Sequence, residues 1–129
     1  MRSQQLVVCS PDNWIANQLR ELAHDRKVLL YEVQHVHAAR RLLENGYFTV
    51  FVLQIEAASV STPVLELVGD VSFLGSQVRT IIVIDTKLNE DDQFMWTVSL
   101  FEIGTELVLF PPLTRTILED AVGELLDAM

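Results

Sequence analysis

The stretch TVFVLQI, from Thr49 to Ile55, is the most apolar run in the chain with the residue types of a β-strand. Its β-branched and aromatic residues follow one another without the alternation of apolar and polar positions that marks a half-exposed strand. A short continuous apolar run predicts a strand buried on both faces, at the centre of a parallel sheet. Gln54 interrupts the run one residue before its end.

Four other segments, on both sides of this run, also have the character of strands. The run 28–33 is less uniform than a buried strand, because Glu32 interrupts it, and we expect it at an edge of the sheet. The strands predicted besides Thr49–Ile55 are Leu6–Cys9, Val28–Val33, Thr80–Ile84 and Glu106–Phe110.

Apolar residues at helical spacing fill the segments that follow each strand. Ser10-Pro11 and Thr62-Pro63 each place a capping residue before a proline, which predicts helices that begin at these pairs. Asn89 is the predicted cap of the fourth helix, whose acidic first turn suits the positive end of the helix dipole. The predicted core stripes of the other four helices include Ile15, Leu19, Leu22, Ala23, Val36, Ala39, Leu43, Val64, Leu67, Val68, Val71, Ile117, Ala121, Val122 and Leu125.

Strands that alternate with single helices predict right-handed crossovers, a parallel sheet and helices on both faces of that sheet. We therefore predict an α/β fold with a doubly wound five-stranded parallel sheet. The chain has 129 residues, the length of one domain with its own core, and no linker or repeat divides it. We expect a single domain over residues 1–129.

The composition limits the kinds of partner that the chain can bind. Eighteen acidic and nine basic residues give a formal net charge of −9, which repels nucleic-acid backbones and anionic lipids. No apolar run approaches the roughly 18 residues of a membrane span. The single Cys9 excludes an internal disulfide, and no Cys or His pair has the spacing of a zinc site. We expect a cytoplasmic protein without a metal, cofactor, nucleic-acid or membrane partner.

In open parallel sheets, ligands bind beyond the carboxyl ends of the strands, where the strand order reverses. The residues at the predicted ends are therefore the candidates for function. They are Cys9, Ser10 and Asp12 after the first strand, Gln54 and Glu56 after the third, Asp85 and Thr86 after the fourth, and Phe110 and Pro111 after the fifth.

Over its whole length this layout resembles the receiver domain of two-component response regulators, a flavodoxin-like (βα)5 fold with strand order 2-1-3-4-5. The resemblance implies an acidic pair that holds magnesium, an aspartate that accepts phosphate, a serine or threonine, and a lysine before a proline. At these places the chain has instead Cys9-Ser10, Gln54, Asp85 and Phe110, and a shift of one residue would restore Thr86 as the hydroxyl.

These departures remove the chemistry that the family implies. A thiol, a hydroxyl and an amide offer magnesium no carboxylate at the matched positions. The amide of Gln54 is no nucleophile, and Phe110 cannot supply a cation beside a transferred phosphoryl group. We expect a degenerate phosphorylation pocket, formed by Cys9, Ser10, Gln54, Asp85, Thr86 and Phe110, with no catalytic residue.

Three alternatives keep a chemical or ligand-binding role for the same region. Asp12, Glu56 and Asp85 would form a rearranged acidic site if all three faced one pocket. Cys9, at the end of a strand before a helix, is where phosphocysteine enzymes and phosphocarriers place their thiol, although Ile15 stands where the phosphatases have arginine. The third alternative is a sensor pocket for an uncharged or cationic small molecule.

The fourth helix is apolar on more than one face, which exceeds the single stripe that packing on a sheet requires. The resemblance implies pairing through the fourth helix, fifth strand and fifth helix, with a second copy, an output domain or a kinase. We therefore expect a phosphorylation-independent interaction or dimerisation module, a homodimer in signal transduction or transcriptional control. Its predicted interaction surface comprises Phe94, Trp96, Phe101, Leu107 and Ile117.

Overall fold

The computed structural model of the chain describes residues 3–59, 62–74 and 77–128. These residues form one parallel sheet of five strands in the order β2-β1-β3-β4-β5. The order confirms the predicted doubly wound α/β fold, with β3 at the centre and β2 at an edge. The strands are β1 (Gln4–Cys9), β2 (Leu29–Val33), β3 (Phe48–Ile55), β4 (Val78–Ile84) and β5 (Leu107–Leu109).

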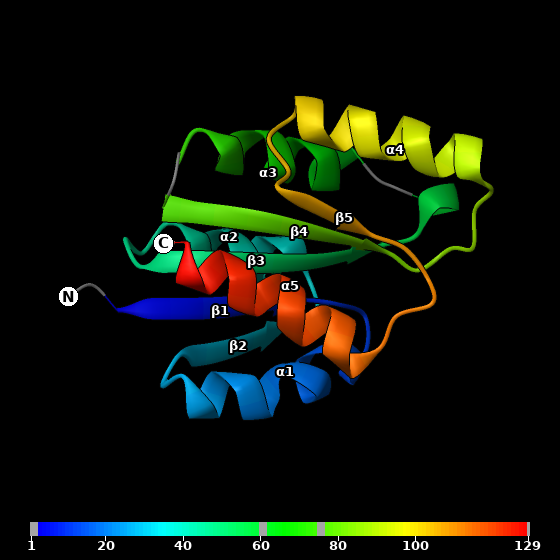
Figure 1. Cartoon of the computed structure of the whole chain (residues 1–129). Coiled ribbons are helices and arrows are strands. Elements are labelled where there is room, and N and C mark those ends of the chain that lie inside the picture. The colour runs from blue at the N-terminus through cyan, green and yellow to red at the C-terminus, as the bar shows by residue number, and fades with distance from the viewer. Residues whose placement is uncertain (1–2, 60–61, 75–76, 129) are drawn as a thin grey trace.

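Helices cover both faces of the sheet (Figure 1). Helices α1 and α5 lie on one face, and α2, α3 and α4 lie on the other. The helices are α1 (Trp14–Asp25), α2 (Val36–Leu43), α3 (Thr62–Ser72), α4 (Glu90–Glu102) and α5 (Arg115–Asp127), and a short 3-10 helix, η1 (Ala57–Ser59), follows β3. The predicted polar loop 56–61 thus contains η1, and its residues 60–61 lie outside the described residues.

The apolar run of β3 is explained by the two cores that it separates. Val50 and Val52 belong to the cluster beneath α1 and α5. Phe51 and Leu53 belong to the cluster beneath α2, α3 and α4. Because successive side chains of a strand point to opposite faces, a strand between two helix layers needs an apolar residue at every position. Burying one large apolar side chain contributes about 1.5–3 kcal/mol, so the run strongly favours this central place.

Helix α1 begins later than the sequence predicts. Ser10 does not act as its cap, because its Oγ donates a hydrogen bond to Gln54 Oε1 at 2.6 Å. Asp12 Oδ1 accepts instead from the backbone N–H of Trp14 at 3.0 Å, and α1 begins at Trp14. The prediction of a helix starting at Ser10-Pro11 was therefore wrong, since a side chain from another strand competes for the hydroxyl.

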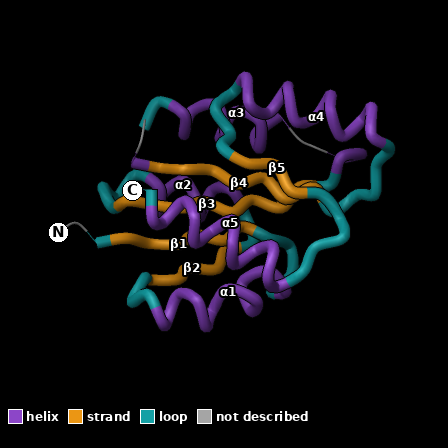
Figure 2. The backbone as a smooth tube through the Cα atoms, viewed as in Figure 1, coloured by secondary structure: helices purple, strands orange, loops and turns teal. Residues whose placement is uncertain are grey.

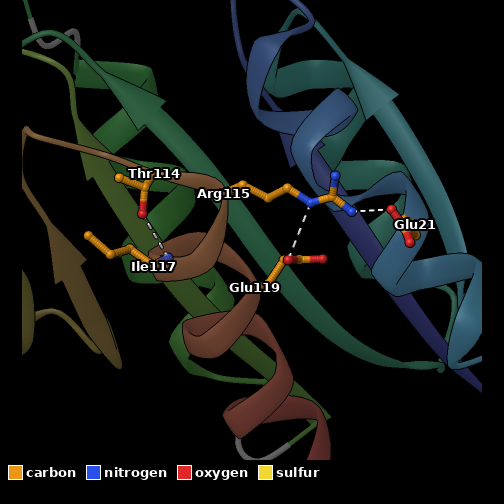
Figure 3. Close-up of polar contacts among 5 residues, drawn as sticks. All are labelled: Glu21, Thr114, Arg115, Ile117 and Glu119. Atoms are coloured by element: carbon orange, nitrogen blue, oxygen red, sulfur yellow. Dashed lines mark hydrogen bonds and ion pairs between the residues drawn. The ribbon is translucent and has the colours of Figure 1, made fainter.

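Helices α4 and α5 begin at residues whose side chains cap the first turn. Helix α3 begins at Thr62, at the predicted Thr62-Pro63 pair. Asn89 Oδ1 accepts from the N–H of Asp92 at 2.8 Å, as predicted for α4. Thr114 Oγ1 accepts from the N–H of Ile117 at 3.2 Å and caps α5 (Figure 3). These bonds satisfy N–H groups that the first turn of a helix leaves without a partner.

The start of β1 and the end of α5 lie at the same end of the molecule (Figure 1). The side-chain amide of Gln4 donates to the carbonyl of Leu126 at 2.9 Å and joins them. The carboxyl ends of the strands lie at the opposite end, which is where the sequence places the candidate residues. Within residues 3–59, 62–74 and 77–128, every helix is too short or too polar to reach across a lipid bilayer.

Candidate functional site

The loops that follow β1, β3, β4 and β5 gather at one edge of the sheet (Figure 2). Pairing of Cys9 with Leu53, and of Gln54 with Val83, brings the ends of β1, β3 and β4 side by side. In this register Ser10 lies level with Gln54, and Asp85 follows β4 two residues beyond Val83, the partner of Gln54. We call these three residues the strand-end cluster.

Hydrogen bonds connect the strand-end cluster from one side to the other. The Ser10 hydroxyl donates to Gln54 Oε1 at 2.6 Å. Gln54 Nε2 in turn donates to Asp85 Oδ2 at 2.8 Å. Backbone bonds hold the outer members, because Ser10 N–H donates to the carbonyl of Val33 and Asp85 N–H donates to the carbonyl of Ile55, both at 3.1 Å. The amide of Gln54 is thus engaged at both its oxygen and its nitrogen.

The chemistry of the three groups fixes the direction of this chain. An ionised carboxylate only accepts hydrogen bonds, so Asp85 requires the N–H side of the amide. The amide oxygen then faces Ser10, whose hydroxyl turns to donate. Ser10 is buried, whereas Asp85 is exposed, so the chain runs from the interior to the surface. An aspartate or glutamate in place of Gln54 would face Asp85 as a second acceptor of like charge.

Thr86 has a separate task beside the cluster. Its Oγ1 accepts a hydrogen bond from the backbone N–H of Ala57 at 3.1 Å, which ties η1 to the end of β4. Asp85, rather than Thr86, is the residue that contacts Gln54. Phe110, after β5, is half-buried and packs against the core beneath α2, α3 and α4.

Cys9 is a core residue. Its side chain is 4% exposed and packs in the cluster that contains Val7, Ala39 and Phe51. Burial raises the pKa of the Cys9 thiol to about 11. Nucleophilic cysteines have lowered pKa values and accessible sulfur atoms. The geometry therefore gives the phosphocysteine alternative no support.

The three carboxylates of the acidic alternative are not assembled into one site. Asp85 bonds to Gln54, and Asp12 bonds to the backbone of Trp14. Within the part of the chain that the structure describes, no three His, Cys, Asp or Glu side chains come close enough together to share a metal ion. Glu56 is exposed beside η1.

The predicted interaction surface is apolar, but its members differ in exposure. Phe94 is 68% exposed on α4, and Phe101 and Ile117 are also exposed. Trp96 and Leu107 are half-buried and pack against the two cores. Apolar side chains of α4 are therefore exposed, in keeping with a helix that is apolar on more than one face.

The structure adds two apolar features to the predicted surface. Val98, with Phe94 and Phe101, completes an exposed stripe at i, i+4 and i+7, which we call the outer stripe. On the other side of α4, Met95 joins Leu65 of α3 in lining a groove between the two helices. The helical spacing of Leu65 against the buried Leu67 and Val68 was the signal in the sequence, since it points Leu65 away from the sheet.

Ion pairs connect α5 to α1 and to the residue that follows α1. Arg115 pairs with Glu21 of α1 and, at 3.3 Å, with Glu119 one turn further along α5 (Figure 3). Arg26, directly after α1, pairs with Asp127 at the end of α5. These contacts orient α5 against α1 and leave Ile117 exposed.

No family model and no curated protein matches the sequence. Solved structures do match the fold. The signal receiver domain of a Vibrio parahaemolyticus protein superposes with a TM-score of 0.73 at 17% identity, covering 99% of this chain and 92% of that one. HP1043, an orphan response regulator of H. pylori, gives 0.70 at 12% identity, over 96% of this chain and 97% of that one. The beryllofluoride-activated NtrC4 receiver domain dimer gives 0.70 at 13% identity, over 97% of each chain.

These comparisons show that the chain has the fold of response-regulator receiver domains. At 12–17% identity the likeness concerns the fold alone. A fold does not specify a function by itself, because function depends on the residues of the site.

Proposed function

We propose that the chain is a receiver-type domain that does not use phosphoryl transfer and works through protein contacts in signal transduction or transcriptional control. Its partners in this proposal are a second copy, an output domain or a kinase. It has no catalytic residue and needs no cofactor, it acts in the cytoplasm, and residues 1–129 act as one domain. The hydrogen-bonded Ser10–Gln54–Asp85 cluster is the single observation that carries the proposal.

The cluster supports the proposal because it uses the strand ends for internal bonds. A phosphoryl acceptor needs an oxygen nucleophile, and Gln54 presents an amide whose two polar atoms bond to Ser10 and Asp85. Magnesium favours several anionic oxygens, and Asp85 is the one carboxylate of the cluster. Phe110 adds bulk and no charge at the side where a cation would stabilise the transferred group.

The outer stripe and its neighbours support contact with another protein. Phe94, Val98 and Phe101 expose apolar surface on one side of α4, and Ile117 exposes more on α5. Contiguous exposed apolar surface on a small domain marks an interaction site. The three-residue strand β5 lies at the edge of the sheet and connects α4 to α5 along the chain. We infer that the exposed residues of the two helices form one face across this edge. We assign the homodimer contact to this face.

Exposure to acetyl phosphate or to beryllofluoride with magnesium tests the absence of phosphoryl chemistry. We expect two-dimensional amide NMR spectra of the protein to stay unchanged with either reagent, and intact mass spectrometry to find no added phosphoryl group. A phosphoryl adduct at the strand ends, or beryllofluoride-dependent shifts of Gln54 and Asp85, would refute the proposal.

Sedimentation velocity across a range of protein concentrations tests the dimer. Phe94→Ser and Phe101→Ser should each shift the equilibrium to monomer, at least tenfold in the dimer dissociation constant. Leu29→Ser is the matched control, because Leu29 is equally an exposed apolar residue but lies on β2, at the opposite edge of the sheet. A wild-type protein that stays monomeric at high concentration would contradict the dimer.

A further inference from the structure

The groove between α3 and α4 is an open apolar depression of about 420 Å³. Helices α3 and α4 lie side by side above the sheet (Figure 1), and the groove is lined from both helices. Its lining residues are Leu65, Met95, Trp96, Ser99, Leu100 and Ile103, which we call the α3–α4 groove. Met95 is 63% exposed at its rim, whereas Leu100 is buried at its floor.

The length of the groove matches the apolar face of a short helix. Met95 and Ile103 are eight positions apart, which is about 12 Å along a helix axis. Apolar residues at i, i+4 and i+7 of an incoming helix span about 10.5 Å. An amphipathic helix that lays one apolar face into a groove is a recurring mode of peptide recognition.

The charge of the groove walls specifies which helix would bind. Neither α3 nor α4 contains a lysine or arginine, and together they carry Glu66, Asp70, Glu90, Asp91, Asp92 and Glu102. Among these acids, Asp70 is compensated by an ion pair with Arg40 of α2. On α4, Asp92, Met95, Ser99 and Glu102 lie on one stripe, since they are spaced i, i+3, i+7 and i+10. The stripe of α4 that contributes Met95 and Ser99 to the groove thus has a carboxylate at each of its ends.

We propose that the α3–α4 groove binds a basic amphipathic helix of a partner protein. Three apolar side chains of that helix enter the groove, and its lysine or arginine residues face Asp92 and Glu102. This contact goes beyond the dimer assigned to the outer stripe, because it uses the other side of α4.

A second copy of this chain does not fit the groove. The symmetric contact of a dimer would set the acids of α3 and α4 against the same acids of the partner copy. Like charges in such a contact oppose binding, and the whole chain carries a net charge of −9. A helix with an acidic polar face is disfavoured for the same reason.

Tryptophan fluorescence offers a direct test, because the chain has two tryptophans and only Trp96 lines the groove. Trp14 is an exposed residue at the start of α1, and the Trp14→Phe variant leaves Trp96 as the only tryptophan that fluoresces. The probe is a synthetic helical peptide of about 14 residues with leucine at i, i+4 and i+7 and lysine on the other face. We expect micromolar binding, a blue shift of Trp96 emission and a matching rise in the anisotropy of labelled peptide.

Altered peptides and protein variants separate groove binding from nonspecific attraction between a basic peptide and an acidic protein. A peptide with glutamate in place of lysine, and a peptide with its leucines scrambled, should each bind at least tenfold more weakly. Ser99→Phe fills the groove and should weaken binding at least tenfold, whereas Phe94→Ser on the outer stripe should leave it within twofold. Asp92→Lys with Glu102→Lys, both at exposed positions, should weaken the lysine peptide and improve the glutamate peptide.

Several results would overturn the proposal. They are an absence of binding, equal binding of the scrambled peptide, unchanged binding to Ser99→Phe, and a Trp96 shift that depends on protein concentration without peptide. The last result would show that a second copy occupies the groove. If sedimentation finds only monomer, the peptide-binding tests remain valid, because they probe the groove side of α4 and not the outer stripe.

Discussion

Gln54 is the residue on which the state of the strand ends depends. Its amide offers an acceptor to Ser10 and a donor to Asp85, whereas the ionised carboxylate of a glutamate of the same length offers acceptors only. The cluster therefore suits an amide and does not suit a carboxylate. This preference leads to a test in which the residue keeps its shape and changes its charge.

Gln54→Glu should destabilise the protein by about 1–2 kcal/mol at pH 7, since a second carboxylate would face Asp85 with like charge and without a shared proton. Water screens part of this repulsion because Asp85 is exposed. The repulsion raises the pKa of the carboxyl pair in the folded state, so the loss should be small near pH 4 and grow as pH rises to 7. Urea unfolding at several pH values measures it.

Asp85→Asn provides the matched control for this change. In the double variant Gln54→Glu with Asp85→Asn, the new amide donates and the new carboxylate accepts, so the hydrogen bond is restored with its direction reversed. We expect most of the lost stability at pH 7 to return. A double variant as unstable as the sum of the two single variants would show that the Gln54–Asp85 contact does not act as described.

Cys9 should make the unfolding free energy of the wild-type protein depend on pH. Its pKa is about 11 in the folded protein, where burial disfavours the thiolate, against an ordinary value of 9.0 for an exposed thiol. The stability linked to this proton is fully present below pH 9 and is lost as pH rises through 11. The difference in unfolding free energy between wild type and Cys9→Ala should fall by about 2–3 kcal/mol across that interval. A constant difference, or rapid iodoacetamide labelling at neutral pH, would contradict a buried thiol.

At the scale of elements, the central strands were predictable because burial on both faces requires an uninterrupted run of apolar residues, which is visible in the sequence. The run Thr49–Ile55 lies within β3, and the polar interruption at Glu32 marks the edge strand β2. Local competition limited the prediction elsewhere. Ser10 reads as a helix cap, and only the folded register reveals that Gln54 lies within reach of its hydroxyl.

The candidate site was predictable as a set of positions and not as a set of bonds. Parallel strands bring their carboxyl ends to one edge, so Ser10, Gln54 and Asp85 could be grouped from the sequence. The direction of the amide, and the bond from Ala57 to Thr86, depend on side-chain rotamers and loop geometry that the sequence pattern does not contain. The groove escaped prediction because it needs two helices placed side by side.

The junction from α4 to β5 depends on Gly104, which has a φ of +103°. A Cβ on this residue would lie 2.4 Å from Ser72 Cβ of α3. Gly104→Ala should therefore cost about 2–4 kcal/mol, the sum of backbone strain and overpacking. Gly69→Ala is the matched control, because a Cβ at that position in α3 meets nothing within 4 Å, and it should stabilise the protein by about 0.5–1 kcal/mol.

Thermal and urea unfolding of both glycine variants measure these effects. Adding Ser72→Gly to Gly104→Ala should recover the part of the loss that comes from the clash and leave the part that comes from the backbone. A Gly104→Ala variant as stable as the wild type would show that α3 and α4 do not approach as closely as described.

For the whole molecule, the distribution of charge separates the two proposed contacts. Five arginines, Arg20, Arg26, Arg40, Arg79 and Arg115, are engaged in ion pairs with acidic residues. The acidic residues Glu90, Asp91, Asp92 and Glu102 of α4 take part in none of these five ion pairs. Any partner of α4 meets a negative surface, and its own charge decides how salt affects the contact.

The two contacts should consequently respond to salt in opposite directions. A dimer brings together two chains of net charge −9, so screening of their repulsion should strengthen it. The lysine peptide is attracted to the same charge, and screening should weaken it. The Debye length is about 10 Å at 0.1 M and about 3 Å at 1 M ionic strength. Between 0.05 and about 0.5 M sodium chloride, we therefore expect the dimer dissociation constant to fall severalfold and that of the peptide to rise at least tenfold. Sedimentation and peptide anisotropy on one protein preparation measure both. If the two constants moved in the same direction, charge would not be what distinguishes the outer stripe from the groove, and the assignment of a basic partner to the groove would be lost.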